Sequence, residues 1–304
     1  MDARYQTASD VLDAWRDDIH TGKAPTLFPC GVGELAKIEI GPGLVTLIGG
    51  APGAGKSAFT MQLIIDALRL SPELRACVCN VEMPPLVLLD RQLARVSGVD
   101  LTTIRHRRLT AEHAERIDAG IATLEAIADR LAFVRPPFDL ENTAATVDAI
   151  NADVIVLDYL QRIRPPGDHA DGRTAINATM DFLRQFADQR KSLIVVSAVG
   201  RTKDSRGRNS YTGDGLNLAS FKESGELEYG ADDAYIIVPG KTPDVVVLRQ
   251  LKSRYGECGD LALTFDKPRQ RFSAGTSEGD EARQHLAAMW NETAAADANE
   301  GDAE

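Results

Sequence analysis

Membrane spans, disulfide scaffolds and metal clusters all lack support in this sequence of 304 residues. No apolar run approaches the length of about 18 residues that a bilayer-spanning helix needs, and the N-terminus has no basic region followed by an apolar core. The five histidines are scattered, without metal-ligand spacing to the four cysteines. Cys77 and Cys79 alternate within an apolar run, which predicts reduced, buried side chains on one strand face. These absences favour a protein of a bacterial-type cytoplasm that has no membrane partner.

Basic residues are outnumbered, but the acidic excess is local. The formal net charge is −11, and residues 277–304 hold eight acids against one base, Arg283, so the preceding residues carry only −4. The body of the chain is therefore nearly balanced, and its acidity does not exclude a nucleic-acid partner that binds a local basic surface. Residues 276–304 are alanine-rich and acidic, and we expect them to form a disordered tail.

Strand and helix patterns alternate along most of the chain, which is typical of an α/β fold with a mainly parallel sheet and helices on both faces. Three late strands have no long helix between them and should pair antiparallel. Residues 1–24 are expected to form a leading helix, capped by Ser9, and a linker. Thr110 should cap a long helix. Strands are expected at 44–48, 76–81, 131–134, 154–157, 193–196, 234–238, 245–251 and 261–265, and helices at 56–70, 86–96, 110–130, 142–150 and 175–190.

The strongest motif lies between the first expected strand and the helix that follows it. It fits the Walker A pattern, in which glycines let backbone N–H groups converge on phosphate oxygens and a helix N-terminus adds positive charge. Lys56 would neutralise the β- and γ-phosphates, and the Ser57 hydroxyl would hold Mg²⁺. The loop predicts a site for ATP or GTP, and we take ATP as the nucleotide. Its residues are Gly50, Ala51, Pro52, Gly53, Ala54, Gly55, Lys56 and Ser57.

A second element of the nucleotide site is the apolar run at 154–157, which ends in Asp158. At the carboxyl edge of a parallel sheet, such an aspartate can hold Mg²⁺ beside the phosphates, as in a Walker B strand. Many buried strands end in aspartate at a turn, and this is the alternative when the run stands alone. Because the Walker A loop lies upstream, the metal-site interpretation is preferred, with Ser57 and Asp158 as the Mg²⁺ ligands.

Further segments carry a resemblance to a known family. They are residues 80–83, 96–101, 158–161 and 222–228, in the right order at plausible spacing. With the Walker motifs they make the chain similar to the C-terminal ATPase domain of DnaB-type replicative helicases over roughly residues 25–273. The resemblance implies a RecA-like P-loop domain over residues 25–275, without the separate helical N-terminal domain usual in the family. It also implies a hexameric ring that moves on single-stranded DNA in replication, with a replication loader or primase as a further partner.

The resemblance assigns catalytic roles residue by residue. Glu82 matches the glutamate that activates the attacking water, and a carboxylate facing the γ-phosphate suits that role. Lys252 and Arg254 match the basic pair that reaches the nucleotide of a neighbouring subunit, where an arginine finger is worth about 10³–10⁵ in rate. Without the resemblance, Glu82 would be a solvated strand end and the basic pair part of an exposed edge strand. If the pair acts in trans, each active site lies between subunits and head-to-tail contacts close a ring.

DNA contacts are expected from two segments that offer phosphate contacts rather than base recognition. One matches the loop that follows the DNA backbone in the family. The other is a flexible basic stretch that would line the same channel, with a solvated surface loop as an equal alternative. The first segment holds Lys222, Glu223 and Gly225, and the second holds Arg201, Lys203, Arg206 and Arg208.

Two positions depart from the family pattern. Ala198 stands where the family usually has a glutamine that senses the γ-phosphate, and alanine cannot hydrogen-bond to phosphate. Lys222 stands where the family has an arginine, which keeps the charge but loses the planar fork. Three functions therefore stay open. We prefer a DNA helicase or helicase-like motor. The others are an ATP-gated assembly or regulatory protein, and a RecA-type recombination or repair ATPase, which the Glu-Ser-Gly segment at 223–225 disfavours.

Overall fold

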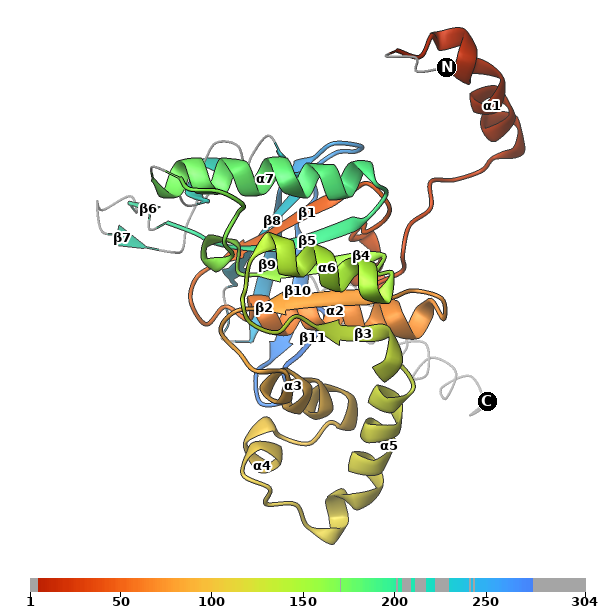
Figure 1. Ribbon diagram of the computed structural model, residues 1–304. Coiled ribbons are helices and arrows are strands. Elements are labelled where there is room, and N and C mark those ends of the chain that lie inside the picture. The colour runs from red at the N-terminus through yellow and green to blue at the C-terminus, as the bar shows by residue number, and fades with distance from the viewer. Residues whose placement is uncertain are drawn as a thin grey trace, which may run out of the picture.

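Figure 1 shows the computed structural model of the chain, in which residues 5–169, 171–200, 202–203, 209–210, 217–221, 230–240, 242 and 244–275 are described. These residues form an α/β domain, as the alternating pattern predicts. The expected tail, residues 276–304, lies outside the described part of the chain. No helix of the described part is both long and apolar enough to cross a membrane.

The domain is built on one nine-stranded sheet. Its strands are β1 (Val45–Gly50), β2 (Ala76–Asn80), β3 (Leu131–Phe133), β4 (Val154–Asp158), β5 (Ser192–Ala198), β8 (Asp233–Pro239), β9 (Val245–Ser253), β10 (Leu261–Asp266) and β11 (Arg271–Ala274). They lie in the order β11-β10-β9-β8-β1-β5-β4-β2-β3. All pairs from β8 to β3 are parallel, whereas β9, β10 and β11 add to β8 in antiparallel fashion. The antiparallel pairing predicted for the late strands is confirmed.

Successive residues of the central strands enter two separate cores, one on each face of the sheet. Val154 and Val156 of β4 belong to the core beneath α2, whereas Ile155 and Leu157 belong to the core beneath α6 and α7. Burial on both faces explains why these strands are nearly continuous apolar runs. Cys77 and Cys79 of β2 are buried free thiols in the second core, as predicted.

The helices cover both faces of the sheet, and α3, α4 and α5 extend from one end of the domain (Figure 1). This extension has a small core of its own, in which Val99, Ile104 and Ile117 are buried. The helices are α1 (Ala8–Thr21), α2 (Lys56–Leu70), α3 (Pro85–Ser97), α4 (Leu101–Arg105), α5 (Ala114–Glu125), α6 (Leu140–Ile150) and α7 (Gly172–Asp188).

The prediction of one long helix at 110–130 is wrong. Thr110 caps a short 3₁₀ turn (Ala111–His113) before α5, and another 3₁₀ turn (Ala128–Arg130) follows it. The helix ends where Ile127 enters the core, at 2% exposure. The arginine that ends the second turn donates three hydrogen bonds to carbonyls in the last turn of α2 and in the loop just after it. Core burial and these tertiary hydrogen bonds override the helical propensity of the segment.

Smaller differences between the predicted and the observed elements concern a helix cap and two short elements. Ser9 does not cap the leading helix, because Thr7 and Asp10 form a reciprocal capping box that begins two residues earlier. The sequence also missed α4, which has five residues, and β11, which has four residues and one buried side chain, Phe272. Both are too short to show a periodic pattern.

Helix α1 stands apart from the body of the domain (Figure 1). All of its residues are exposed, including the predicted apolar face of Val11, Leu12, Trp15 and Ile19. Its apolar side chains therefore have no covering surface within the described part of this subunit.

Candidate active site

The loop between β1 and α2 is shaped by its glycines and closed by its lysine. Gly55 has a φ of 94°, and a Cβ at that position would lie 2.8 Å from the rings of Phe265 and Phe272. Nζ of Lys56 donates hydrogen bonds to the carbonyl oxygens of Gly50, at 2.8 Å, and Ala51, at 3.1 Å. The lysine thus lies over its own loop.

Acidic side chains from the end of β4 and from the turn after β2 lie near this lysine. Burial lowers the pKa of Lys56, while the carboxylates of Asp158 and Glu82 raise it. Burial raises the pKa of Asp158, against the effects of a hydrogen bond from Ser57 and the charge of Lys56. These interactions bring the lysine, the hydroxyl and both carboxylates, all predicted from the sequence, into one charged site.

Asn80, at the end of β2, joins the two acidic residues of the site. Strands β2 and β4 pair so that Asn80 lies opposite Asp158, and its Nδ2 donates to Oδ2 of Asp158 at 2.6 Å. Its Oδ1 accepts hydrogen bonds from the backbone N–H groups of Glu82, at 3.0 Å, and Met83, at 2.8 Å. The amide orientation follows from the partners, because a carboxylate accepts and a backbone N–H donates. Asn80 therefore positions both the Asp158 carboxylate and the turn that carries Glu82.

These groups open into a pocket of about 510 Å³. The pocket is lined by the Walker A loop, Glu82, Asp158 and Ala198. Ala198 ends β5, and its backbone N–H donates to Oε1 of Gln161 at 3.2 Å. The strand end that lines the pocket thus contributes a methyl group and no side-chain donor.

The pocket also has polar lining residues that the sequence analysis missed. They are Arg91 from α3, and Lys267 and Gln270 from the turn between β10 and β11. Arg91 lies in the helix predicted at 86–96. Placing that helix against the one that follows the Walker A loop would have brought Arg91 to the pocket. Lys267 and Gln270 depend on β11, whose pattern is too short to detect.

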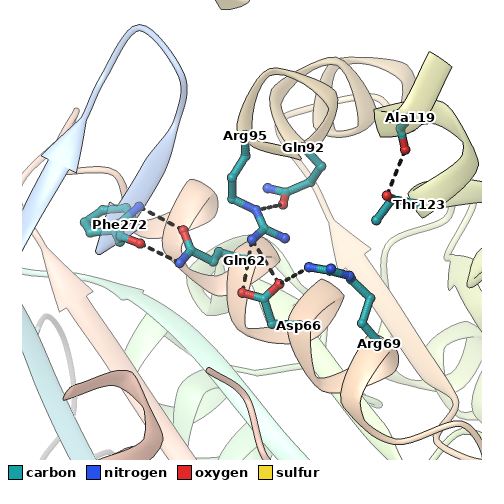
Figure 2. A network of polar contacts seen from close by, with 8 residues as sticks. All are labelled: Gln62, Asp66, Arg69, Gln92, Arg95, Ala119, Thr123 and Phe272. Carbon is teal, nitrogen blue, oxygen red and sulfur yellow. Dashed lines mark hydrogen bonds and ion pairs between the residues drawn. The ribbon is translucent and has the colours of Figure 1, made fainter. Parts of the chain in front are cut away.

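Helix α2, which carries the phosphate loop, is held by polar side chains on its outer face, as Figure 2 shows. Gln62 pairs through both amide atoms with the backbone N–H and carbonyl of Phe272, each at 2.8 Å. Asp66 binds Nη1 of Arg95 at 2.9 and 3.0 Å, and Nε of Arg95 donates to Oε1 of Gln92 at 2.8 Å. These contacts tie α2 to β11 and to α3, so the loop rests on a fixed support.

Lys252 and Arg254 lie at the end of the sheet where β1 begins, opposite the end that carries the phosphate loop. Because β8 runs parallel to β1 and β9 returns antiparallel, the end of β9 lies level with the start of β1. Nη1 of Arg254 contacts Oδ1 of Asp232 at 2.6 Å. Asp232 is 1% exposed and also accepts from the backbone N–H of Val45 and from Nη1 of Arg184, each at 2.8 Å. The basic pair is therefore not brought to the nucleotide pocket of this chain.

Most of the residues expected to contact DNA lie outside the described part of the chain. Lys203 belongs to β6 (Thr202–Lys203), which pairs with β7 (Asn209–Ser210). The flanks of the two basic segments lie together, since Val199 bridges to Phe221 beside the end of β5. The described residues just before the two segments are therefore neighbours. The residues expected to contact DNA that lie outside the described part are Arg201, Arg206, Arg208, Lys222, Glu223 and Gly225.

The fold and the pocket define a P-loop domain of the α/β class, with two acidic residues beside a Walker A loop, Asp158 at the end of β4 and Glu82 just after β2. Residues 30–274 match the model of the DnaB-like helicase C terminal domain, and the chain belongs to this family. The resemblance predicted from the sequence is confirmed.

Individual relatives agree with this membership. Replicative DNA helicase DnaB of Buchnera aphidicola subsp. Schizaphis graminum is 27% identical over 249 residues, which are 76% of this chain and 51% of the relative. The protein of the same name from Haemophilus influenzae is 28% identical over 264 residues, 80% of this chain and 54% of the relative. The chain thus spans about half the length of these relatives. DNA repair protein RadA of Rickettsia conorii is 26% identical over 245 residues, 77% of this chain and 44% of the relative.

Solved structures show the same fold. One of them, an isolated ATPase domain, superposes with a TM-score of 0.75 at 18% identity, covering 89% of this chain and 99% of that one. A DnaB-like replicative helicase, described with its interactions with primase, superposes with a TM-score of 0.74 at 18% identity. The match covers 88% of this chain and 67% of that one. The predicted α/β class, with its mainly parallel sheet and late antiparallel strands, is confirmed.

Proposed function

We propose that this chain is an ATP-hydrolysing motor that forms a ring and moves on single-stranded DNA in replication, as a helicase or helicase-like protein. One observation carries the proposal. The Walker residues and Glu82 meet in one pocket, while Lys252 and Arg254 lie at the opposite edge of the sheet, away from that pocket. Such a division suits a catalytic site that is completed by the next subunit.

In this proposal, ATP lies with its phosphates over the N–H groups of the Walker A loop, beside Lys56. Mg²⁺ fits the residues present, because the Ser57 hydroxyl and the Asp158 carboxylate are oxygen ligands already in contact, and the buried carboxylate favours a nearby cation. When bound, the ion neutralises charge on the β- and γ-phosphates. Glu82 accepts the proton of the attacking water.

We also propose a hexameric ring in the cytoplasm, with a replication loader or primase as a partner. Relatives that are replicative DNA helicases support the role in replication, and the similar helicase structure described with primase supports primase as a partner. The exposed apolar face of α1 suits contact with another protein surface. The basic segments at 201–208 and 222–225, whose preceding residues Val199 and Phe221 form a bridge, would line a DNA channel.

The proposal is tested by measuring ATP hydrolysis with and without single-stranded DNA, alongside the mass of the assembly. We expect a ring of six subunits in ATP and Mg²⁺, and faster hydrolysis when DNA is added. DNA binding should weaken as salt rises, because phosphate contacts release counterions. A monomer that hydrolyses ATP at full rate, indifferent to DNA, would reject both the ring and the motor.

A variant at Asn80 tests the arrangement of the acidic residues. We expect Asn80→Ala to raise the Mg²⁺ concentration needed for half-maximal hydrolysis by about 10- to 100-fold, because residues that orient a metal ligand have effects of this size. Titration of activity against Mg²⁺ measures the change. Asn142→Ala is the matched control, since it removes an asparagine whose side-chain amide donates two hydrogen bonds to carbonyls away from the pocket. Equal Mg²⁺ curves for both variants would show that Asn80 does not position the metal site.

A second function is favoured by Ala198, which gives the pocket no side-chain donor from β5. In an ATP-gated assembly or regulatory protein, nucleotide would control ring formation without driving movement on DNA. The two functions differ in one measurement. The motor predicts hydrolysis that DNA accelerates, whereas the gated assembly predicts nucleotide-dependent mass with hydrolysis that DNA leaves unchanged.

A further inference from the structure

A second cavity, of about 540 Å³, lies beside the outer face of α2. Among the described residues, it shares no lining residue with the nucleotide pocket. The nucleotide pocket is lined by Lys56 and Ser57 from the start of α2, whereas this cavity is lined by Asp66 and Arg69 from near its end. At about 1.5 Å per residue, Ser57 and Asp66 lie about 14 Å apart along the helix. The two cavities are therefore separate sites.

Basic side chains from three elements line this cavity. Arg69 comes from α2, Arg95 from α3 and Arg271 from β11. In the described part of the chain, Asp66 is the one acidic residue of the lining. Arg271 is half-exposed, and its ion pair is a long one, at 3.8 Å, to Asp266, which is not among the residues that line the cavity. The cavity therefore has an excess of positive charge.

The aspartate does not satisfy all the donors around it. Asp66 binds Nη1 of Arg95 at 2.9 and 3.0 Å and contacts Nη1 of Arg69 at 3.4 Å (Figure 2). The Arg95 side chain is 7% exposed, and its Nη2 is buried without a hydrogen-bond partner among the described residues. The same holds for Nε2 of Gln92, whose Oε1 accepts from Nε of Arg95. Buried donors without partners are costly, and they call for a ligand or another explanation.

The three guanidinium groups also repel one another. Burial lowers the pKa of Arg95, and Asp66 opposes this effect through its charge and its hydrogen bond. The charges of Arg69 and Arg271 lower this pKa further. An anion with several free oxygens, placed among the three groups, would relieve their repulsion and accept the unused N–H of Arg95.

The arrangement of donors favours phosphate as this anion. A guanidinium group matches phosphate oxygens through paired N–H donors. Because the three arginines come from three different elements, a tetrahedral group with several oxygens suits them better than a planar carboxylate with two. The volume is within the range of small-molecule sites. Val32, Leu70 and Phe272 add an apolar part to the lining, which suits a ligand with an organic group.

We infer that this cavity is a second anion site, which binds a phosphate group between Arg69, Arg95 and Arg271. The phosphate group belongs either to free inorganic phosphate or to a phosphate ester whose organic part lies on the apolar lining. Neither source is the nucleotide of the Walker A loop. The inference therefore goes beyond the proposed function and does not depend on it.

The test measures phosphate binding to the full-length protein while its nucleotide pocket is filled. Mg²⁺ and an excess of an ATP analogue with nitrogen between its β- and γ-phosphates, which is not hydrolysed, are present throughout. The probes are inorganic phosphate and phenyl phosphate, titrated by phosphorus NMR. We expect saturable binding, which Arg69→Gln and Arg271→Gln each weaken by about 3- to 10-fold, because both side chains are half-exposed and water screens their charge. Tighter binding of phenyl phosphate would identify a phosphate ester as the source, and equal affinities would identify free phosphate.

The matched control is Arg107→Gln, because Arg107 is an exposed arginine that pairs with Asp90 outside the cavity. This variant and Lys56→Ala should both leave phosphate affinity unchanged, and thermal unfolding should show that each variant is folded. Asp66→Asn removes the carboxylate that competes with phosphate, so it should bind phosphate more tightly than the wild type does. If Asp66→Asn does not fold, the two arginine variants still decide. Absence of saturable binding by the wild type, or equal binding by the wild type and both arginine variants, would overturn the inference.

Discussion

We expect Lys56→Ala to abolish nucleotide binding or turnover. Lys56 is the only cationic residue in the loop from Gly50 to Ser57, and its Nζ already lies over the loop carbonyls, where phosphate would bind. No neighbour within the loop can replace its charge. We expect hydrolysis to fall by at least about 10²–10³-fold, the effect of removing one donor that stabilises transition-state charge. Titration with a fluorescent nucleotide and a phosphate-release assay measure the two losses.

The matched control is Lys37→Ala, which removes an exposed lysine paired with Glu34 outside the pocket. Glu82→Gln should give a different defect, with ATP affinity kept and hydrolysis slowed, because the amide cannot accept the proton of water. Wild-type hydrolysis by Lys56→Ala would remove the phosphate-loop assignment. Normal hydrolysis by Glu82→Gln would place the base on another residue.

Mixing two inactive variants should restore activity if Arg254 acts on the nucleotide of a neighbour. Lys56→Ala lacks a working phosphate loop but still offers its arginine, whereas Arg254→Ala has the opposite defect. Each alone should lose at least about 10³-fold in hydrolysis. In a mixed ring, some interfaces pair an intact loop with an intact arginine. ATPase activity should therefore return in part and vary with the mixing ratio.

The position of Arg254 makes this experiment informative. It follows β9, at the edge of the sheet opposite its own phosphate loop, so activity within one subunit is not expected. Arg249→Ala, within β9 and paired with the exposed Asp260, is the matched control and should keep full activity. Arg254→Ala also removes a partner of Asp232, so its unfolding temperature must be compared with that of the wild type. Mixed rings that show only the sum of the two residual activities would exclude catalysis in trans.

The parts of the site that could be predicted from the sequence depend on local patterns. The Walker A loop has a fixed spacing, and Asp158 ends a continuous apolar strand. Parallel strands end at one edge of the sheet, so the acidic residues after β2 and β4 meet there whatever the details of packing. The central strands could also be predicted from a local pattern, since burial on both faces of the sheet requires unbroken apolar runs.

The remaining features depend on how strands are aligned and helices are packed, which leaves no local pattern in the sequence. Asn80 continues the strand pattern of β2, and its role appears only when β2 and β4 are aligned so that it lies opposite Asp158. Arg91 belongs to an ordinary helical face until α3 is packed on α2. The break after α5 follows from burial of Ile127, which an amphipathic pattern does not distinguish from continued helix.

Arg254 shares its carboxylate partner, Asp232, with Arg184, and this determines the free-energy cost of moving Arg254 away from the domain. A buried carboxylate stripped of its sole cation would be left with an uncompensated charge, which typically costs about 3–5 kcal/mol. Asp232 has two cations, and departure of Arg254 would leave Arg184 and the N–H of Val45 in place. If Arg254 acts in trans, its move across a subunit boundary would exchange one anion for another, carboxylate for phosphate. Because Asp232 would keep Arg184 throughout, the exchange would be reversible each time a neighbour releases its nucleotide.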